Sequence, residues 1–188
     1  MPERRHPIEA AGLSLTELAK AIAARGASPP VDRWNPPHCG HSEMRIARDG
    51  TWFHQGPPID RPAMVRLFST ILRREADGHH VLVTPIERLD IDVEATAFRA
   101  TQMTMAGGGE DRRIGLTLDS GDALIVGADH PLTIVETNEG PSPPVAVRFG
   151  LEAELTRPLY YELAEIPLAE GHDPPGIWSD GIFFSLMP

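Results

Sequence analysis

The sequence predicts an α+β protein of two domains, a small helix-and-hairpin domain at residues 1–78 and a larger β-rich domain with one helix at residues 79–188. Two observations support this prediction. Helical spacing of apolar residues is confined to short segments, whereas from residue 79 onward apolar and polar residues alternate with the period of a strand. Turn residues divide that region into short strands, which is typical of an antiparallel, strongly curved sheet or a partly closed barrel.

The first domain is expected to combine two helices with one hairpin. Residues 14–17 have the spacing of a capping box and precede an amphipathic helix predicted over residues 15–25. Prolines 29, 30, 36 and 37 then exclude a regular helix. Strands are predicted at residues 43–47 and 51–55, separated by an Asp49-Gly50 turn.

The second helix is predicted to begin with Asp60 as its cap and Pro62 in its first turn, and to end near Gly78. A third helix is predicted to begin at residues 156–158 and to end near residues 166–167. The strands predicted between and after these two helices are 81–83, 89–93, 98–105, 114–118, 123–126, 132–137, 145–155 and 182–186.

Overall composition restricts the possible partners. The 188-residue chain is 41% hydrophobic and carries a formal charge of −10, which disfavours nonspecific nucleic-acid binding and docking on anionic membranes. No apolar run approaches the roughly 20 residues of a membrane-spanning helix, and no signal peptide opens the sequence. The single cysteine cannot form an internal disulfide. We therefore expect a cytoplasmic protein that neither binds nucleic acid nor inserts into membranes.

Two patterns occur once in each half of the sequence. Arg61-Pro62 is followed by an apolar helical face, as is Arg157-Pro158, and the turn and strand at residues 49–53 resemble those at residues 180–184. The order of helix and strand differs between the copies. The echoes indicate either an internal duplication or the recurrence of common helix-start chemistry.

Several blocks taken together resemble a bacterial family known as domain-of-unknown-function family 1285. They are CG at 39–40, MRI at 44–46, DGTWF at 49–53, VTPIE at 83–87 and VRFGLEAELTRPLYYELAE at 147–165. The resemblance covers the chain from about residue 30 to the C-terminus. It implies a domain duplication, a C-terminal domain superficially similar to pleckstrin-homology folds, a nucleotide-type ligand at the domain interface and a role in signal transduction. The family pattern usually has an acidic residue after Cys-Gly, where this chain has His41.

The Arg-Pro helix starts are the favoured place for an anionic ligand, because free backbone N–H groups and a guanidinium can converge there. Asp60 brings a competing negative charge to the first start, whereas Thr156 is neutral, so Arg157 is preferred over Arg61. Arg148, on the strand that leads into the third helix, is a further ligand candidate, although it can instead pair with a nearby glutamate.

Aromatic residues complete the predicted ligand site. Tyr160 and Tyr161 offer a stacking face for a base, with ordinary packing as the alternative. Residues 30–62 are expected to form one wall of the cleft, which adds Trp34 and Arg45 to the candidates.

No complete catalytic or metal signature is present. His38, Cys39 and His41, with His54 across the hairpin, are the sharpest metal candidates, but their spacing matches no standard zinc site. Cys39 lacks the local signature of a nucleophile. Asp90, Asp92 and Glu94 share one face of a predicted strand, and we interpret that face as exposed to solvent rather than as a cation site. We predict no catalytic residue, no bound metal and no cofactor.

The leading functional prediction is a noncatalytic regulatory protein that binds an anionic, nucleotide-like small molecule at the domain interface and acts in signal transduction. One alternative is a metal-assisted hydrolase that uses the His38/Cys39/His41 cluster. The other is a protein-interaction module that docks a protein partner through its first helix or through a sheet edge.

Overall fold

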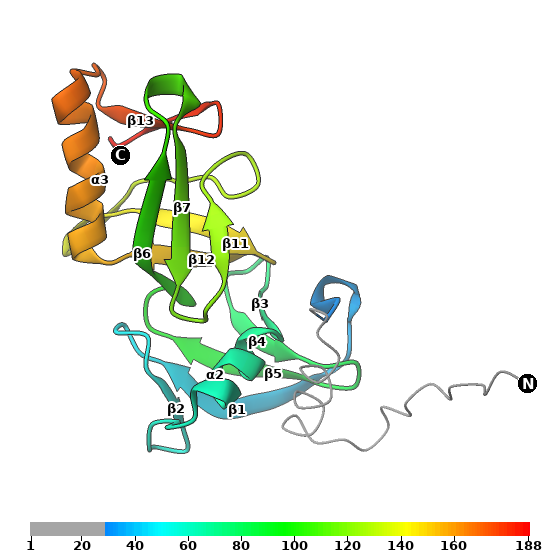
Figure 1. Cartoon of the computed structure of the whole chain (residues 1–188). Helices are drawn as coiled ribbons and strands as arrows, with labels where there is room; N and C mark the ends of the chain where they lie inside the picture. The colour runs from blue at the N-terminus through cyan, green and yellow to red at the C-terminus, as the bar shows by residue number, and fades with distance from the viewer. Residues whose placement is uncertain (1–28) are drawn as a thin grey trace, which may run out of the picture.

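In the computed structural model, each half of the chain contains one five-stranded sheet (Figure 1). The structure describes residues 29–188, so the predicted capping box and the helix at residues 15–25 lie outside the described residues. The first sheet ends at Val93 and the second begins at Phe98, so residues 29–96 and 97–188 are called the first and second halves below. The predicted α+β class is confirmed. Neither α-helix in the described part of the chain is long and apolar enough to cross a membrane.

The first half contains one 3-10 turn, one α-helix and five strands: η1 (Val31–Arg33), β1 (His38–Ile46), β2 (Trp52–His54), α2 (Pro62–Ser69), β3 (Leu72–Arg74), β4 (His80–Val83) and β5 (Arg88–Val93). The strand order is β2-β1-β5-β4-β3. The predicted hairpin is confirmed as β1 and β2, and Gly50 adopts a φ of 88° in its turn, which favours glycine.

The second helix ends at Ser69, well before its predicted end near Gly78. Leu72 was expected on the apolar face of that helix, but it lies fully buried in β3, opposite Leu82 of β4. Helical spacing and strand burial can both satisfy the same apolar residues, and sheet pairing prevails here. The predicted Asp60 cap is also wrong, because Arg61 is the N-cap residue and no side chain caps this helix.

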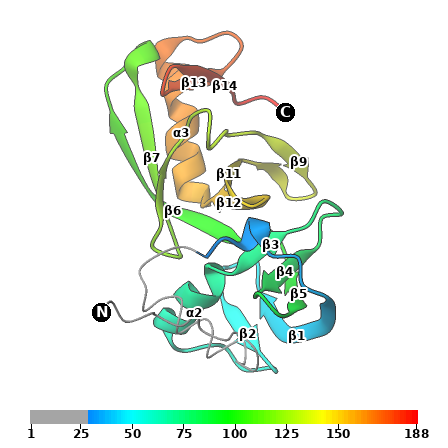
Figure 2. The ribbon, with the colours of Figure 1, turned by 90° about the vertical axis from the view of Figure 1, so that its right-hand side faces the viewer.

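The second half contains a curled sheet, two small hairpins and one long helix: β6 (Phe98–Ala106), η2 (Gly109–Asp111), β7 (Arg113–Leu118), β8 (Ala123–Ile125), β9 (Val135–Thr137), β10 (Gly140–Ser142), β11 (Pro144–Arg148), β12 (Leu151–Leu155), α3 (Arg157–Glu170), β13 (Gly176–Ser179) and β14 (Ile182–Ser185). The sheet order is β11-β12-β6-β7-β8. Figure 2 shows α3 running along this half, with the β13–β14 hairpin at its far end.

Two sequence expectations about these strands are wrong. The strand predicted over residues 145–155 is a hairpin of β11 and β12, because Phe149 and Gly150 turn the chain with φ values of 51° and 75°. The sheets are mixed rather than antiparallel, since β1 pairs with β5 and β12 pairs with β6 in parallel. Strand alternation identifies which residues share a face but does not reveal the direction of the neighbouring strand.

The third helix begins at Arg157 as predicted and continues to Glu170, past Pro167. Gly171 ends it with a φ of 68°, the left-handed conformation common after a helix. Leu159 and Leu163 face the protein interior. The last turn is held by an ion pair between Glu170 and Arg112, whose side chain is almost completely buried.

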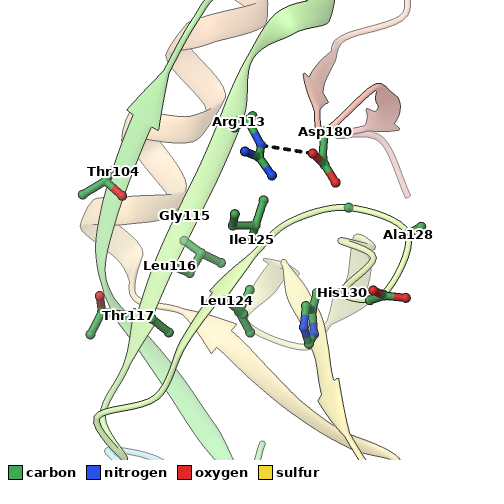
Figure 3. A pocket seen from close by; sticks show the side chains of 13 residues that line it. Thr104, Arg113, Gly115, Leu116, Thr117, Leu124, Ile125, Ala128, His130 and Asp180 are labelled. Carbon is green, nitrogen blue, oxygen red and sulfur yellow. Dashed lines mark hydrogen bonds and ion pairs between the residues drawn. The ribbon is translucent and has the colours of Figure 1, made fainter.

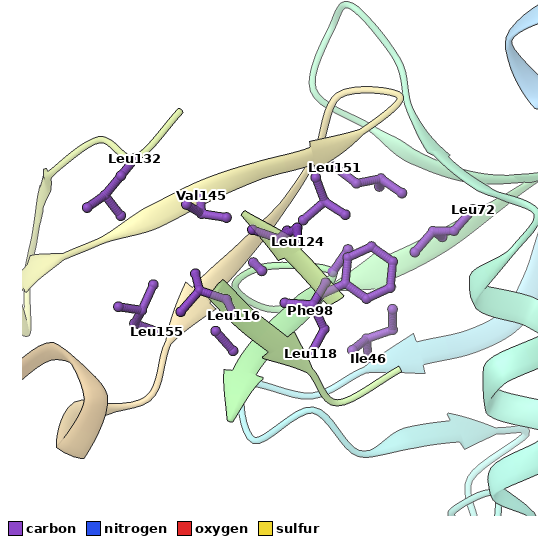
Figure 4. Packing of buried hydrophobic residues seen from close by; sticks show 14 of the residues in the cluster. Ile46, Leu72, Phe98, Leu116, Leu118, Leu124, Leu132, Val145, Leu151 and Leu155 are labelled. Atoms are coloured by element: carbon purple, nitrogen blue, oxygen red, sulfur yellow. The ribbon is translucent and has the colours of Figure 1, made fainter. Parts of the chain in front are cut away.

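One continuous apolar core joins the two halves (Figure 4). Ile46 and Leu72 from the first half belong to the same cluster as Phe98, Leu118 and Leu151 from the second. Burying one such side chain stabilises the fold by about 1.5–3 kcal/mol. Apolar burial across the junction therefore fixes how the halves sit, and with them the shape of any cleft between them.

Candidate functional site

A cleft of about 610 Å³ lies where the two halves meet. This interdomain cleft is lined by Arg48 and residues 94–96 from the first half. The second half contributes Arg99, parts of residues 135–144, one face of β12 and the first turns of α3. Both halves of the chain are needed to form it.

The start of α3 places a cation in the interdomain cleft. The N-cap residue Thr156 makes no side-chain cap hydrogen bond, and the first turn contains no acidic residue. The Arg157 guanidinium donates one long hydrogen bond, 3.4 Å from Nη2 to the Glu139 carbonyl oxygen. Among residues 29–188, no carboxylate forms an ion pair with Arg157. Its charge is therefore available to an anion in the cleft.

Two tyrosines lie beside this arginine on α3. The ring centroids of Tyr160 and Tyr161 are 6.1 Å apart, with an angle of 38° between the ring planes. Tyr160 is half-buried, and Tyr161 is 57% exposed. Both line the cleft, so an aromatic surface lies in the same cleft as the Arg157 guanidinium.

Arg48 and Arg99 also line the cleft, although neither was among the predicted ligand residues. Arg48 lies in the β1–β2 turn and pairs with Glu139 at 3.4 Å. Arg99 donates from Nη1 to the Asp49 carbonyl oxygen at 2.8 Å. The turn docks closely on the second half, since a Cβ built on Gly50 would lie 2.8 Å from Asp119 Oδ2. No local pattern in the sequence predicts this contact between the β1–β2 turn and the second half.

Glutamates alternate with these cations around the cleft. The backbone N–H of Arg48 donates to Glu94, and this bond together with the Arg45 side chain lowers the pKa of that carboxyl. Glu152 pairs with Arg74 at 3.4 Å, and Glu154 accepts a hydrogen bond from the Ser142 hydroxyl at 2.9 Å. The cleft is therefore lined by both positive and negative side chains.

Arg148 does not line the interdomain cleft. It pairs with Asp122 at 2.9 Å, rather than with a glutamate of β12, and donates to the Ser69 carbonyl oxygen at 3.3 Å. Its guanidinium also lies 5.1 Å from the centroid of the Phe98 ring. Arg148 thus links the two halves at another part of their junction.

The remaining predicted ligand residues also lie outside the lining. Arg45 pairs with Glu94 and lies 4.2 Å from the centroid of the Phe53 ring. Arg61 is the N-cap residue of α2. Trp34 packs against the apolar core. The structure therefore brings together Arg157, Tyr160 and Tyr161 from the predicted set and leaves the other four elsewhere.

The proposed metal cluster does not form among residues 29–188, where no three His, Cys, Asp or Glu side chains converge to hold an ion. His38 pairs with Asp90 at 2.9 Å and His41 with Asp92 at 3.5 Å, because the parallel β1–β5 pairing spreads these residues along the strands. The exposed thiol of Cys39 donates to the Pro37 carbonyl oxygen. The hydrolase alternative lacks its cluster in this part of the chain.

A second cavity, of about 540 Å³, lies over β6, β7 and β8 (Figure 3). Gly115 lies between Thr104 and Ile125 in the strand register, and the Thr104 hydroxyl occupies the space above it, 2.8 Å from where a Cβ would lie. The arginine of this cavity, Arg113, already pairs with Asp180 at 3.1 Å. The interdomain cleft is the stronger candidate because its Arg157 has no such partner in the described chain.

Two family models match the chain. One, described as domain of unknown function (DUF1285), N-terminal domain, matches residues 29–96, and the other, protein of unknown function (DUF1285), C-terminal domain, matches residues 97–186. These models meet after β5, between the two sheets. The boundary predicted at residue 78 falls between β3 and β4, which belong to one sheet.

Two solved structures are similar to this chain. A DUF1285 family protein from Silicibacter pomeroyi DSS-3 is 43% identical, with a TM-score of 0.81 over 93% of this chain and 94% of that one. A DUF1285 family protein from Shewanella baltica OS155 shares the fold at 20% identity, with a TM-score of 0.52 over 66% of this chain and 91% of that one. No curated protein matches the sequence.

Proposed function

This chain belongs to the DUF1285 family, and we propose that it is a noncatalytic regulatory protein that binds an anionic, nucleotide-like small molecule in the interdomain cleft. One observation supports this proposal above the others. Arg157 enters a cleft shared by both halves, beside two tyrosines, without a carboxylate partner in residues 29–188.

The cleft residues match the parts of such a ligand. A phosphate accepts charge-assisted hydrogen bonds from a guanidinium, and the positive end of α3 favours the same negative charge. A base can stack on Tyr160 or Tyr161, a contact worth about 1–3 kcal/mol per base in proteins that bind single-stranded nucleic acids. Arg48 and Arg99 line the same cleft and provide further guanidinium donors.

A regulatory role follows from the placement of these groups on both halves. A ligand that contacts Arg48 and Arg157 together bridges the two halves and changes the surface that the protein presents at their junction. A protein partner can recognise the ligand-bound form through the exposed surface of α3, where Tyr161 and Leu168 are 57% and 78% exposed. We assign this role to signal transduction in the cytoplasm.

The proposal extends to the architecture. Both five-stranded sheets have a parallel pair flanked by antiparallel strands, and the two α-helices in residues 29–188 begin at Arg-Pro, which supports an internal duplication. The curled sheet of the second half, followed by a helix near the C-terminus, supports a resemblance to pleckstrin-homology folds.

A thermal-shift panel of nucleotides tests the ligand proposal. A ligand at 100 times its Kd adds about 2.7 kcal/mol, which raises the Tm of a protein of this size by about 5–11 °C. Arg157→Gln should abolish that shift. Arg61→Gln is the matched control, because it alters the other Arg-Pro helix start, which lies outside the cleft. Folded protein that responds to no nucleotide, or equal shifts in wild type and Arg157→Gln, would overturn the proposal.

A further inference from the structure

We propose that the interdomain cleft selects a ligand with one phosphate group and a base that carries an amino group, as in a nucleoside monophosphate such as AMP, and discriminates against the corresponding di- and triphosphates. This inference rests on the proposed function and adds the chemical class of the ligand. It follows from the charged side chains that line the cleft and from the hydrogen bonds and ion pairs that each of them already makes.

The charged lining of the cleft has no positive excess. Among residues 29–188, its charged side chains are three arginines, Arg48, Arg99 and Arg157, and four glutamates, Glu94, Glu139, Glu152 and Glu154. A site for a di- or triphosphate requires several converging cations, because each added phosphate adds negative charge. Four carboxylates in the same lining repel that charge instead.

The arginines differ in how far they are already engaged. Arg48 forms an ion pair with Glu139, and Arg99 is bound to a backbone carbonyl and lies beside Glu154 in the β12–β6 register. Arg157 is the cation of the lining that has neither a carboxylate partner nor a short hydrogen bond among the described residues. One guanidinium, with support from its neighbours, suits one phosphate group of charge about −1.5 to −2.

The glutamates of β12 provide acceptors for the other end of the ligand. Glu152 and Glu154 are two residues apart on a strand, so both side chains point to the same face. Arg74 occupies Glu152 Oε2 and Ser142 occupies Glu154 Oε1, which leaves one oxygen of each carboxylate without a hydrogen-bond partner in residues 29–188. A carboxylate oxygen accepts hydrogen bonds from amino groups on a base edge.

Titration calorimetry with AMP, ADP and ATP in EDTA tests the charge part of the proposal, because EDTA prevents metal ions from neutralising the phosphates. We expect at least tenfold weaker binding of ATP than of AMP. Purine riboside monophosphate differs from AMP by the missing exocyclic amine and should bind at least fivefold more weakly. The double variant Glu152→Gln/Glu154→Gln should reduce both differences, since glutamine keeps the shape and removes the charge.

The matched control is Glu162→Gln, which removes an exposed carboxylate of α3 that does not line the cleft and should leave all the affinities unchanged. Equal or tighter binding of ATP, or equal binding of purine riboside monophosphate, overturns the selectivity and leaves the proposed function standing. If folded protein binds none of these nucleotides, the proposed selectivity is overturned. If no nucleotide of the wider thermal-shift panel raises the Tm, the proposed function is overturned as well.

Discussion

The continuous apolar core predicts that the two halves unfold together, and Leu163 in α3 provides the perturbation that tests this coupling. Leu163 is 1% exposed within the shared core, and the corresponding Leu→Ala changes in other cores cost about 2–5 kcal/mol. With a urea m-value of about 2 kcal/mol per M, Leu163→Ala should lower the unfolding midpoint by about 1–2.5 M.

Tryptophan fluorescence can report each half separately. Trp52 is 4% exposed in β2 of the first half, and Trp178 lies in β13 of the second, with its ring centroid 5.4 Å from that of Phe183. In a background with Trp34→Phe, one variant keeps only Trp52 and another keeps only Trp178. If the core couples the halves, Leu163→Ala shifts the midpoint seen by both tryptophans equally, although Trp52 lies in the other half.

A surface leucine of the same helix supplies the control. Leu168 is 78% exposed, so Leu168→Ala should change stability by less than about 0.5 kcal/mol. If Leu163→Ala moves the Trp178 midpoint while the Trp52 midpoint stays in place, the halves unfold independently. The inference that apolar burial fixes the shape of the interdomain cleft would then be refuted.

Two further predictions concern the second half. Ser179→Ala should lower stability by about 1–3 kcal/mol in urea unfolding, because the buried Ser179 hydroxyl accepts from the Ile114 N–H at 3.0 Å and donates to the Val126 carbonyl oxygen at 2.7 Å; an unchanged midpoint would contradict this role. The hydrogen bond from Arg112 lowers the pKa of Glu170 from 4.5 to about 2, so its stabilisation is present above about pH 4.5 and is lost as the pH falls toward 2. Glu170→Gln should therefore lose less stability than wild type between pH 5 and pH 2.5, and parallel pH profiles would count against the pair.

The parts of the fold that sequence predicted correctly have local causes. Gly50 closes the predicted first hairpin and Gly181 lies in the turn before the predicted last strand, each with a positive φ that glycine adopts easily. Pro62 and Pro158 mark helix starts because a missing N–H costs nothing in the first turn. In each case the residues that produce the element lie within a few positions of it.

The failures have a common cause in contacts between distant segments. Leu72 fits the apolar face of a helix as well as a strand, and its place in a strand comes from the pairing of β3 with β4, where it lies opposite Leu82. The parallel pairing of β12 with β6 joins Ala153 to Phe98 across the whole β7–β11 segment. Such pairings depend on which strands meet in space, and the alternation within one strand does not contain that information.

The same division between local and distant causes applies to the candidate site. The cation and aromatic residues at Arg157, Tyr160 and Tyr161 were predictable because one helix start places them together. Arg48 and Arg99 join them only because the β1–β2 turn packs against the second half. Their contribution requires the assembled core.

The two Arg-Pro helix starts show why a motif is insufficient to define a site. Arg61 and Arg157 both precede or begin a helix whose first turn has no side-chain cap and no acidic residue, and their local chemistry differs mainly in the preceding residue, Asp60 or Thr156. Their neighbours differ, because α3 begins directly after β12 at the junction of the halves, whereas Arg61 lines none of the cavities described above. A comparison of Arg61→Gln with Arg157→Gln therefore separates the intrinsic anion affinity of an Arg-Pro helix start from the contribution of the cleft around it.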